Sequence, residues 1–257
     1  MVVQLHMGWI DVLFANWSAD PEVVAPHVPD SVSLDTYDGR AWLSLLPFVN
    51  VDVRPVWLPA GTGIRIPEVN LRTYVTREGR PAIYFFNLDA ADLLTVVGAR
   101  LTHFLPYYYA SIDHEVGEDG RVRVEHRRRH PGARPARFVA EYGPDGEAFE
   151  AEPGSLAEFL TERHRYYAES PSGELRYADV RHPRWTLHSA EATIEENTLF
   201  RANDFETPES EPICYYSPSV ETVATPNRRW KPTRGESREE SKGGDGRVRR
   251  RGTEPIR

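Results

Sequence analysis

The stretch that decides the fold reads Pro67-Glu-Val-Asn-Leu-Arg-Thr-Tyr-Val75. Polar and apolar residues alternate along it, which is typical of a β-strand because successive side chains on a strand point to opposite faces. One face therefore carries Glu68, Asn70, Arg72 and Tyr74, and the other face is mostly apolar. Since a strand rises about 3.3 Å per residue, the backbones of Glu68 and Arg72 are roughly 13 Å apart. This is too far for a tight ion pair along the strand, and a small ligand would fit between the two side chains.

This polar face has two interpretations, and the strand alone leaves both open. In the first, the face binds a ligand: Arg72 grips a carboxylate and Glu68 moves a proton. In the second, the face is the solvated side of a half-buried strand, which is the more common source of such alternation.

The near absence of lysine excludes one kind of chemistry. The chain has two lysines, Lys231 and Lys242, and both lie near the C-terminal end. A Schiff base with a carbonyl substrate needs a lysine amine. Residues 1–226 therefore have no side chain that would form one.

Length and charge predict one folded domain and a tail. The 257 residues fit one large or two small domains. Residues 1–226 carry 34 acidic and 20 basic side chains, whereas residues 227–257 carry five acidic and eleven basic ones. We predict a single domain over 1–226 and a basic, disordered tail over 227–257, which has few apolar residues. The acidic domain disfavours nucleic acid and anionic membranes as partners.

A cytoplasmic location is expected from three observations. Cys214 is the single cysteine, so no disulfide forms within the chain. The first residues lack the basic and apolar segments of a signal peptide. No apolar run approaches the roughly 18 residues that a membrane helix requires.

The remaining pattern predicts many short strands. Strands are expected at residues 40–49, 81–88, 107–116, 121–129, 137–142, 184–194 and 213–216. Gly117 to Gly120 is expected to turn a hairpin, and the Gly-Pro-Asp-Gly run at 143–146 is expected to end a strand.

Two or three helices are expected beside these strands. One short helix is predicted at 21–27. A second is predicted at 90–101, with Asp89 as its N-cap. Its expected buried stripe is Leu93, Leu94, Val97 and Leu101. A third is predicted from Ser155 to about residue 167, because Ser155 and Glu158 form a capping box.

Other chemistry finds little support, and we expect no cofactor and no metal site. His126 and His130 are four residues apart, but three arginines lie between them and oppose a cation. The nucleophile motif Gly-x-Ser-x-Gly and a glycine-rich phosphate loop are both absent. Cys214 lies between apolar and aromatic neighbours, which is not the setting of an activated thiolate.

An ordered set of short motifs resembles a known family. The motifs are Phe14-Ala-Asn-Trp17, Val28-Pro29, Leu34-Asp35, Asp38-Gly-Arg-Ala-Trp42, Pro47-Phe48, the 67–75 stretch, Gly98-Ala-Arg100, Leu105-Pro-Tyr107, Leu160-Thr-Glu-Arg163, Tyr166-Tyr167, His182-Pro-Arg-Trp185 and Tyr216-Ser-Pro218. Together they resemble the YqjF-like domain-of-unknown-function family 2071 over residues 9–223. That family is similar in fold to acetoacetate decarboxylase. The resemblance implies a mainly β (α+β) fold, an antiparallel β-barrel or cone with two or three flanking helices and an internal cavity.

The resemblance does not carry an activity over, because acetoacetate decarboxylase works through a Schiff-base lysine and this domain has none. We therefore expect a small-molecule-binding protein whose ligand bears a carboxylate or a carbonyl. Its expected ligand-binding residues are Glu68, Asn70, Arg72 and Tyr74.

Two alternatives to a binding protein remain open, as does homo-oligomer formation. One is a lyase or hydrolase in which Glu68 carries the proton, Arg72 stabilises charge and His103 assists. The other is a structural role, in which Glu68 and Arg72 join a buried ion network with Arg40 or Arg100. Whether the protein is an enzyme is not decided by the sequence.

Overall fold

The computed structural model describes residues 3–231, and this part of the chain is mostly β-structure. The strands are β1 (Leu5–Ala19), β2 (Ser33–Leu34), β3 (Ala41–Pro55), β4 (Ile64–Arg77), β5 (Arg80–Ala90), β6 (Tyr107–Val116), β7 (Val122–Arg128), β8 (Arg137–Phe149), β9 (Arg165–Glu169), β10 (Leu175–Arg181), β11 (Leu187–Asn197), β12 (Ile213–Ala224) and β13 (Arg228–Arg229). The helices are α1 (Pro21–Val24), the 3-10 helix η1 (Ala25–His27), α2 (Leu93–Thr102), α3 (Leu156–Thr161) and α4 (Leu199–Ala202). The prediction of a mainly β fold is confirmed, but the described residues contain four α-helices where two or three were expected.

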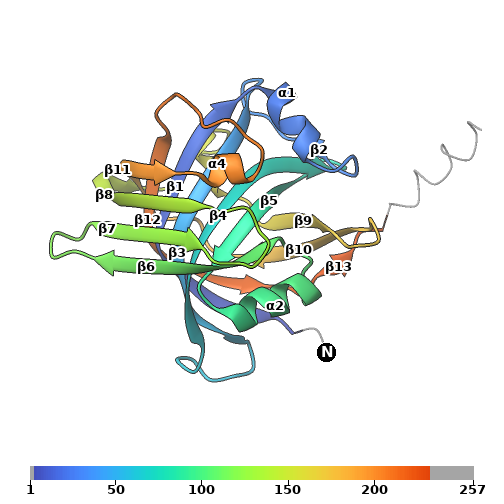
Figure 1. The fold of residues 1–257 in the computed structure, drawn as a ribbon, viewed down its shortest axis with the longest axis horizontal. Helices are drawn as coiled ribbons and strands as arrows, with labels where there is room; N and C mark the ends of the chain where they lie inside the picture. The colour runs from blue at the N-terminus through green and yellow to red at the C-terminus, as the bar shows by residue number, and fades with distance from the viewer. Residues whose placement is uncertain (1–2, 232–257) are drawn as a thin grey trace, which may run out of the picture.

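The strand pairings form a closed circuit. Starting from β4, hydrogen-bonded neighbours run through β5, β9, β10, β12, β1 and β3 and back to β4. The first long strand, β1, pairs along most of its length with β12, near the other end of the described chain. Most pairs are antiparallel, but β5 is parallel to both β6 and β9. The long strands β1, β3, β4 and β5 cross the middle of the molecule, and α2 lies at one end (Figure 1).

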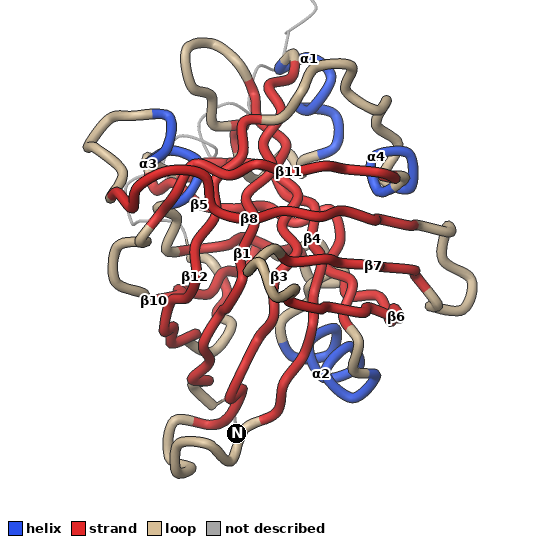
Figure 2. The backbone as a smooth tube through the Cα atoms, turned by 90° about the vertical axis from the view of Figure 1, so that its left-hand side faces the viewer, coloured by secondary structure: helices blue, strands red, loops and turns tan. Residues whose placement is uncertain are grey.

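A second layer covers one side of these long strands. Figure 2 shows β6, β7, β8 and β11 stacked across β1 and β3. Between the two layers lies the largest core cluster, in which Leu45, Val69 and Leu71 pack with Phe138 and Tyr142. Because the apolar face of β4 is buried in this core, its polar face must point to the opposite side.

Several boundaries differ from the predicted ones, each for a tertiary reason. The strand β8 does not stop at Gly143 but continues to Phe149, because Gly143, Pro144 and Asp145 pair with β11. Pro144 is tolerated there because β7 pairs no further than Tyr142, which leaves that side of β8 an edge. The helix α3 has the predicted Ser155 cap but ends at Thr161, because Tyr166 and Tyr167 belong to β9.

The prediction for α2 was wrong in its start and in its buried face. The N-cap is Asp92, whose carboxylate accepts a hydrogen bond from Thr95 N at 2.6 Å. The expected stripe is on the outside: Leu94 and Leu101 are 82 % and 72 % exposed, and Leu93 and Val97 are also exposed. The buried residue is Val96.

Described structure continues past the predicted domain end at residue 226. The strand β13 pairs with β10, and the Trp230 ring packs against Tyr167 and Tyr177. The rest of the predicted tail, residues 232–257, lies outside the described residues. No helix within residues 3–231 is both long enough and apolar enough to span a membrane.

Asp89, the expected cap, is instead the centre of a buried ion cluster at the end of β5. It accepts hydrogen bonds from Nε and Nη2 of Arg128, both at 2.8 Å, and from the Asn87 amide at 2.9 Å. Nε2 of His126 lies 2.8 Å from Oδ2 of Asp89, the same oxygen that accepts from Arg128 Nε. Although burial alone would raise the pKa of Asp89, His126 and Arg128 hold that pKa below its usual range.

We expect Asp89→Asn to lower the free energy of unfolding by about 3–5 kcal/mol, because it leaves the buried Arg128 guanidinium without its anion. Asp92→Ala removes only a helix cap and should cost about 1 kcal/mol. Urea unfolding of the two variants and the wild type measures both changes. Equal costs would contradict the assignment of Asp89 to the ion cluster and Asp92 to the cap.

Candidate functional site

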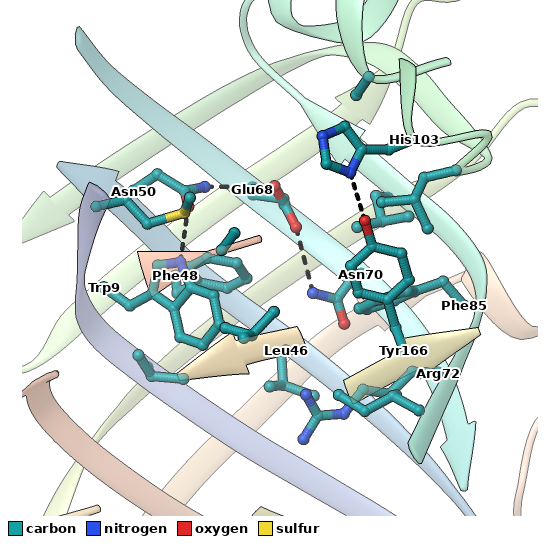
Figure 3. Close-up of a pocket in the computed structure, with 18 of the residues that line it drawn as sticks. Trp9, Leu46, Phe48, Asn50, Glu68, Asn70, Arg72, Phe85, His103 and Tyr166 are labelled. Atoms are coloured by element: carbon teal, nitrogen blue, oxygen red, sulfur yellow. Dashed lines mark hydrogen bonds between the residues drawn. The ribbon is translucent and has the colours of Figure 1, made fainter. Parts of the chain in front are cut away.

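An internal cavity of about 170 Å³ lies among the central strands, α2 and the β9–β10 hairpin. Most of its wall is apolar and aromatic, as in ordinary ligand pockets. Trp9, Phe48 and Leu46 stand on one side and Phe85 on the other (Figure 3). The polar groups are few, so each one has a large effect on what the cavity can hold.

Three of the polar groups come in a row from β4. Glu68, Asn70 and Arg72 all line the cavity, and they follow one another along the strand (Figure 3). They are 4 %, 3 % and 6 % exposed, respectively. The interpretation of this face as solvated is therefore wrong, because β4 is flanked by β3 and β5 and is covered on both faces.

Glu68 is a buried carboxyl group held by three donors. The Tyr107 hydroxyl donates to Glu68 Oε2 at 2.9 Å, and the Asn50 amide donates to the same oxygen at 3.3 Å. The Asn70 amide donates to Oε1 at 3.3 Å. Burial raises the pKa of Glu68 to about 7, and the three hydrogen bonds only partly oppose this rise. The group thus both holds and releases a proton near neutral pH.

Asn70 has a free acceptor. Its amide nitrogen is used by Glu68, but its Oδ1 atom is buried and has no hydrogen-bond partner within the described chain. Buried acceptors of this kind are rare in folded proteins. A ligand hydroxyl or N–H group in the cavity would satisfy it.

Arg72 is a buried cation without an anion. Its Nη2 donates to the Leu160 carbonyl at 3.1 Å, its Nε has no partner, and no carboxylate in residues 3–231 forms an ion pair with it. The rings of Phe14 and Tyr74 lie 5.6 and 5.8 Å from the guanidinium carbon. Burial lowers the pKa of Arg72.

Three other buried arginines in the described chain have an anionic partner. Arg54, Arg128 and Arg163 are also under 10 % exposed, and each pairs with an aspartate at 2.8–3.0 Å. Arg72 is thus set apart by the missing partner and not by its burial.

Tyr74, the fourth predicted residue, is not among the residues that line the cavity. Its hydroxyl donates to the Leu160 carbonyl at 2.8 Å and lies 2.7 Å from the Ser44 hydroxyl. It therefore fixes the end of α3 beside Arg72 and does not itself reach the cavity.

Sequence reasoning missed the tyrosines opposite β4. Tyr107 contacts Glu68. The Tyr166 hydroxyl lies 2.5 Å from Nδ1 of His103 (Figure 3). Burial lowers the pKa of His103 and raises that of Tyr166. No local signal marks these residues, because the parallel pairing of β9 with β5 places Tyr166 opposite Ile83, which is 83 residues earlier in the chain.

The predicted ion network is not formed among the described residues. Arg40 is exposed, and Arg100 donates to the Tyr107 carbonyl at 2.6 Å and forms no ion pair with Glu68. The buried ion network of this fold is the Asp89 cluster. His126 belongs to that cluster, while His130 accepts a hydrogen bond from Tyr109 N, so the two histidines serve separate contacts.

Comparison with known proteins assigns the chain to a family. Residues 6–221 match the model of DUF2071, described as an uncharacterized conserved protein. The chain is 42 % identical to "Uncharacterized protein YqjF" of Bacillus subtilis (strain 168), over 88 % of this chain and 92 % of that protein. The chain therefore belongs to the DUF2071 family, as the sequence motifs predict.

Solved structures with a similar fold are acetoacetate decarboxylase-like. An acetoacetate decarboxylase-like enzyme from Sphingomonas wittichii RW1 aligns with a TM-score of 0.59 at 16 % identity, covering 90 % of this chain and 94 % of that chain. The enduracididine biosynthesis enzyme MppR, complexed with pyruvate, aligns with a TM-score of 0.60 at 13 % identity, covering 89 % and 91 %. At such identities the likeness defines the fold alone.

The pKa of Glu68 makes stability depend on pH. Because this pKa lies near 7 in the folded protein and near 4.5 in an exposed carboxyl, the folded state binds one additional proton between these pH values. The free energy of unfolding therefore falls as pH rises from about 4.5 to 7, by about 3 kcal/mol from this group. Urea unfolding of wild type and Glu68→Gln at pH 5 and pH 8 should show this decrease in the wild type and lose it in the variant. An identical pH dependence in both proteins would mean that Glu68 titrates as an exposed carboxyl.

Proposed function

We propose that this protein binds a small molecule bearing a carboxylate or a polarised carbonyl group in the cavity, without Schiff-base chemistry. The observation that carries the proposal is the buried Arg72 guanidinium, which lines the cavity and has no carboxylate partner in the described chain. An unpaired charge is costly to bury. A ligand carboxylate would supply the missing anion and accept two hydrogen bonds from the fork of the guanidinium.

Asn70 and the size and wall of the cavity indicate further properties of the ligand. The free Asn70 Oδ1 favours a ligand that also carries a hydroxyl or N–H donor next to its acidic group. The cavity volume, about 170 Å³, favours a ligand of modest size. For comparison, an engineered cavity of about 150 Å³ accommodates benzene. The apolar wall suits a short hydrocarbon or aromatic portion.

We further propose that the closed circuit of strands acts as a barrel or cone whose interior is this cavity. The order of the pairings supports this proposal, and so do the acetoacetate decarboxylase-like neighbours. One of these neighbours, the enduracididine biosynthesis enzyme MppR, is complexed with pyruvate in its solved structure. Pyruvate is therefore a suitable first probe, since it carries both a carboxylate and a carbonyl.

A second candidate function is a lyase or hydrolase acting on the same class of molecule. It is favoured by the pKa of Glu68, which burial raises to about 7, because a general acid–base works best when its pKa is near the working pH. In this mechanism Glu68 carries the proton, Arg72 stabilises negative charge as it develops on the substrate, and the His103–Tyr166 pair assists from the other side of the cavity.

Arg72→Met is the most informative variant, because methionine keeps much of the length and apolar surface but removes the charge. We expect it to abolish pyruvate binding, measured by calorimetry on the full chain. Its free energy of unfolding should change by less than about 1 kcal/mol or rise, because an unpaired buried charge is removed.

Two further variants sharpen this test. Arg72→Lys should not restore binding, because an ammonium does not replace the planar fork. Leu71→Ala, on the apolar face of the same strand, should lower stability by about 2–5 kcal/mol while leaving pyruvate affinity in the folded protein unchanged. Unchanged binding by Arg72→Met would remove the basis of the proposal.

Borohydride reduction separates this protein from Schiff-base decarboxylases. With pyruvate or a β-keto acid present, reduction should leave no adduct on residues 1–226, because they contain no lysine. Mass spectrometry of the digested protein measures this directly. A stable adduct within that range would show that another amine takes the part of lysine.

A further inference from the structure

A second group of reactive side chains gathers beside the cavity wall. Glu162, His164 and His182 bring one potential ligand atom each to within 4.8 Å of one another. All three lie at the open end of the β9–β10 hairpin, outside the row on β4. His182 also lines the cavity, so this group and the cavity share a side chain.

The register of the hairpin explains why these residues meet. The last strand pair is Arg165 with Asp179, and the hydrogen bond from Val180 N to the His164 carbonyl, at 2.9 Å, extends the ladder by one step. This step places His164 opposite Val180, so His182 is the diagonal neighbour of His164. Glu162 is the residue that ends α3 (φ −91°, ψ 66°), and the chain that leaves this helix brings its carboxylate to the two histidines. Cross-strand and diagonal neighbours of this kind are within side-chain reach.

Glu162 is a nearly buried carboxylate without a cation. Its side chain is 7 % exposed, and its Oε1 accepts a hydrogen bond from Trp185 N at 3.0 Å. Its Oε2 lies 3.8 Å from His164 Nε2, which is too long for a hydrogen bond. No arginine or lysine in residues 3–231 forms an ion pair with it. The Trp185 contact therefore orients the carboxylate and leaves one oxygen directed at an imidazole.

The two imidazoles have the features of metal ligands. Nδ1 of His182 lies 2.7 Å from the Pro183 carbonyl, so this nitrogen donates its proton and leaves Nε2 with a lone pair. Metal-binding histidines are commonly held by such a carbonyl contact. The His164 and His182 rings stack, with centroids 4.2 Å apart. The His164 side chain is 53 % exposed, which gives an ion a path from solvent.

We propose that Glu162, His164 and His182 form a binding site for a divalent transition-metal ion of the zinc class. Two imidazoles and one carboxylate are a donor set that zinc uses where a fourth position stays open. Ligand atoms around tetrahedral zinc are about 3.3 Å apart, given bonds of about 2.0–2.1 Å. The 3.8 Å gap between His164 and Glu162 therefore needs to close by only a small amount.

The open position would lie at the edge of the cavity, because His182 belongs to both. The metal site does not depend on the proposed ligand of Arg72. Either site can exist without the other.

Zinc titration of the untagged full chain, first freed of metal with a chelator, tests the proposal by calorimetry. We expect one zinc ion per chain. Glu162→Gln keeps the acceptor for Trp185 N but removes the charge, and His164→Gln changes a largely exposed side chain. Each should weaken zinc binding by at least about tenfold.

His188→Gln is the matched control, because His188 lies outside the group and contacts the Gly146 carbonyl. Its zinc affinity should equal that of the wild type. Melting temperatures in chelator verify that the variants are folded, and His164→Gln should match the wild type there. Absence of one-to-one zinc binding in the wild type overturns the proposal, as does wild-type affinity in either Glu162→Gln or His164→Gln.

Discussion

The buried positive charge of Arg72, which has no carboxylate partner in the described chain, is the main physical constraint on the cavity. A guanidinium in a nearly dry interior normally has an acid beside it, and three other buried arginines of the described chain follow that rule. Arg72 instead faces a cavity, together with Asn70, whose Oδ1 atom has no hydrogen-bond partner within the described chain. The strand β4 is covered on both faces, since the apolar core packs against one face and the cavity lies against the other.

The molecule uses buried charge in two different ways. At Asp89, the carboxylate and the Arg128 guanidinium are partners at 2.8 Å, and this ion pair joins β5 to β7. Along β4, Glu68 and Arg72 are kept from pairing by their spacing and by Asn70 between them. The first arrangement stabilises the native state. The second leaves a buried cation without an anion among the described residues, and the proposed binding site rests on this feature.

The sequence predicted the strand period, the composition of both faces of β4 and the exclusion of lysine chemistry, because these follow from local order. It could not decide whether the polar face points outward or inward, since alternation looks the same in both cases. The α2 stripe was misassigned because leucines on a helix are not always buried, and Asp89 was misread as a cap because its partner, Arg128, is 39 residues away. Tyr107 and Tyr166 reach the cavity through the pairing of β6 and β9 with β5, which no local pattern encodes. His103, which was expected to assist, follows the end of α2 and lines the cavity.

The pairing of β1 with β12 has a consequence for how this chain is made. The partner strand β12 is synthesised some 200 residues after β1. Until then, one edge of a long apolar strand lacks its neighbour and the circuit stays open. Such long-range closure slows folding and exposes strand edges to association with other chains. The early partner β3 covers only the other edge of β1, so the edge that pairs with β12 stays unpaired until the end of synthesis.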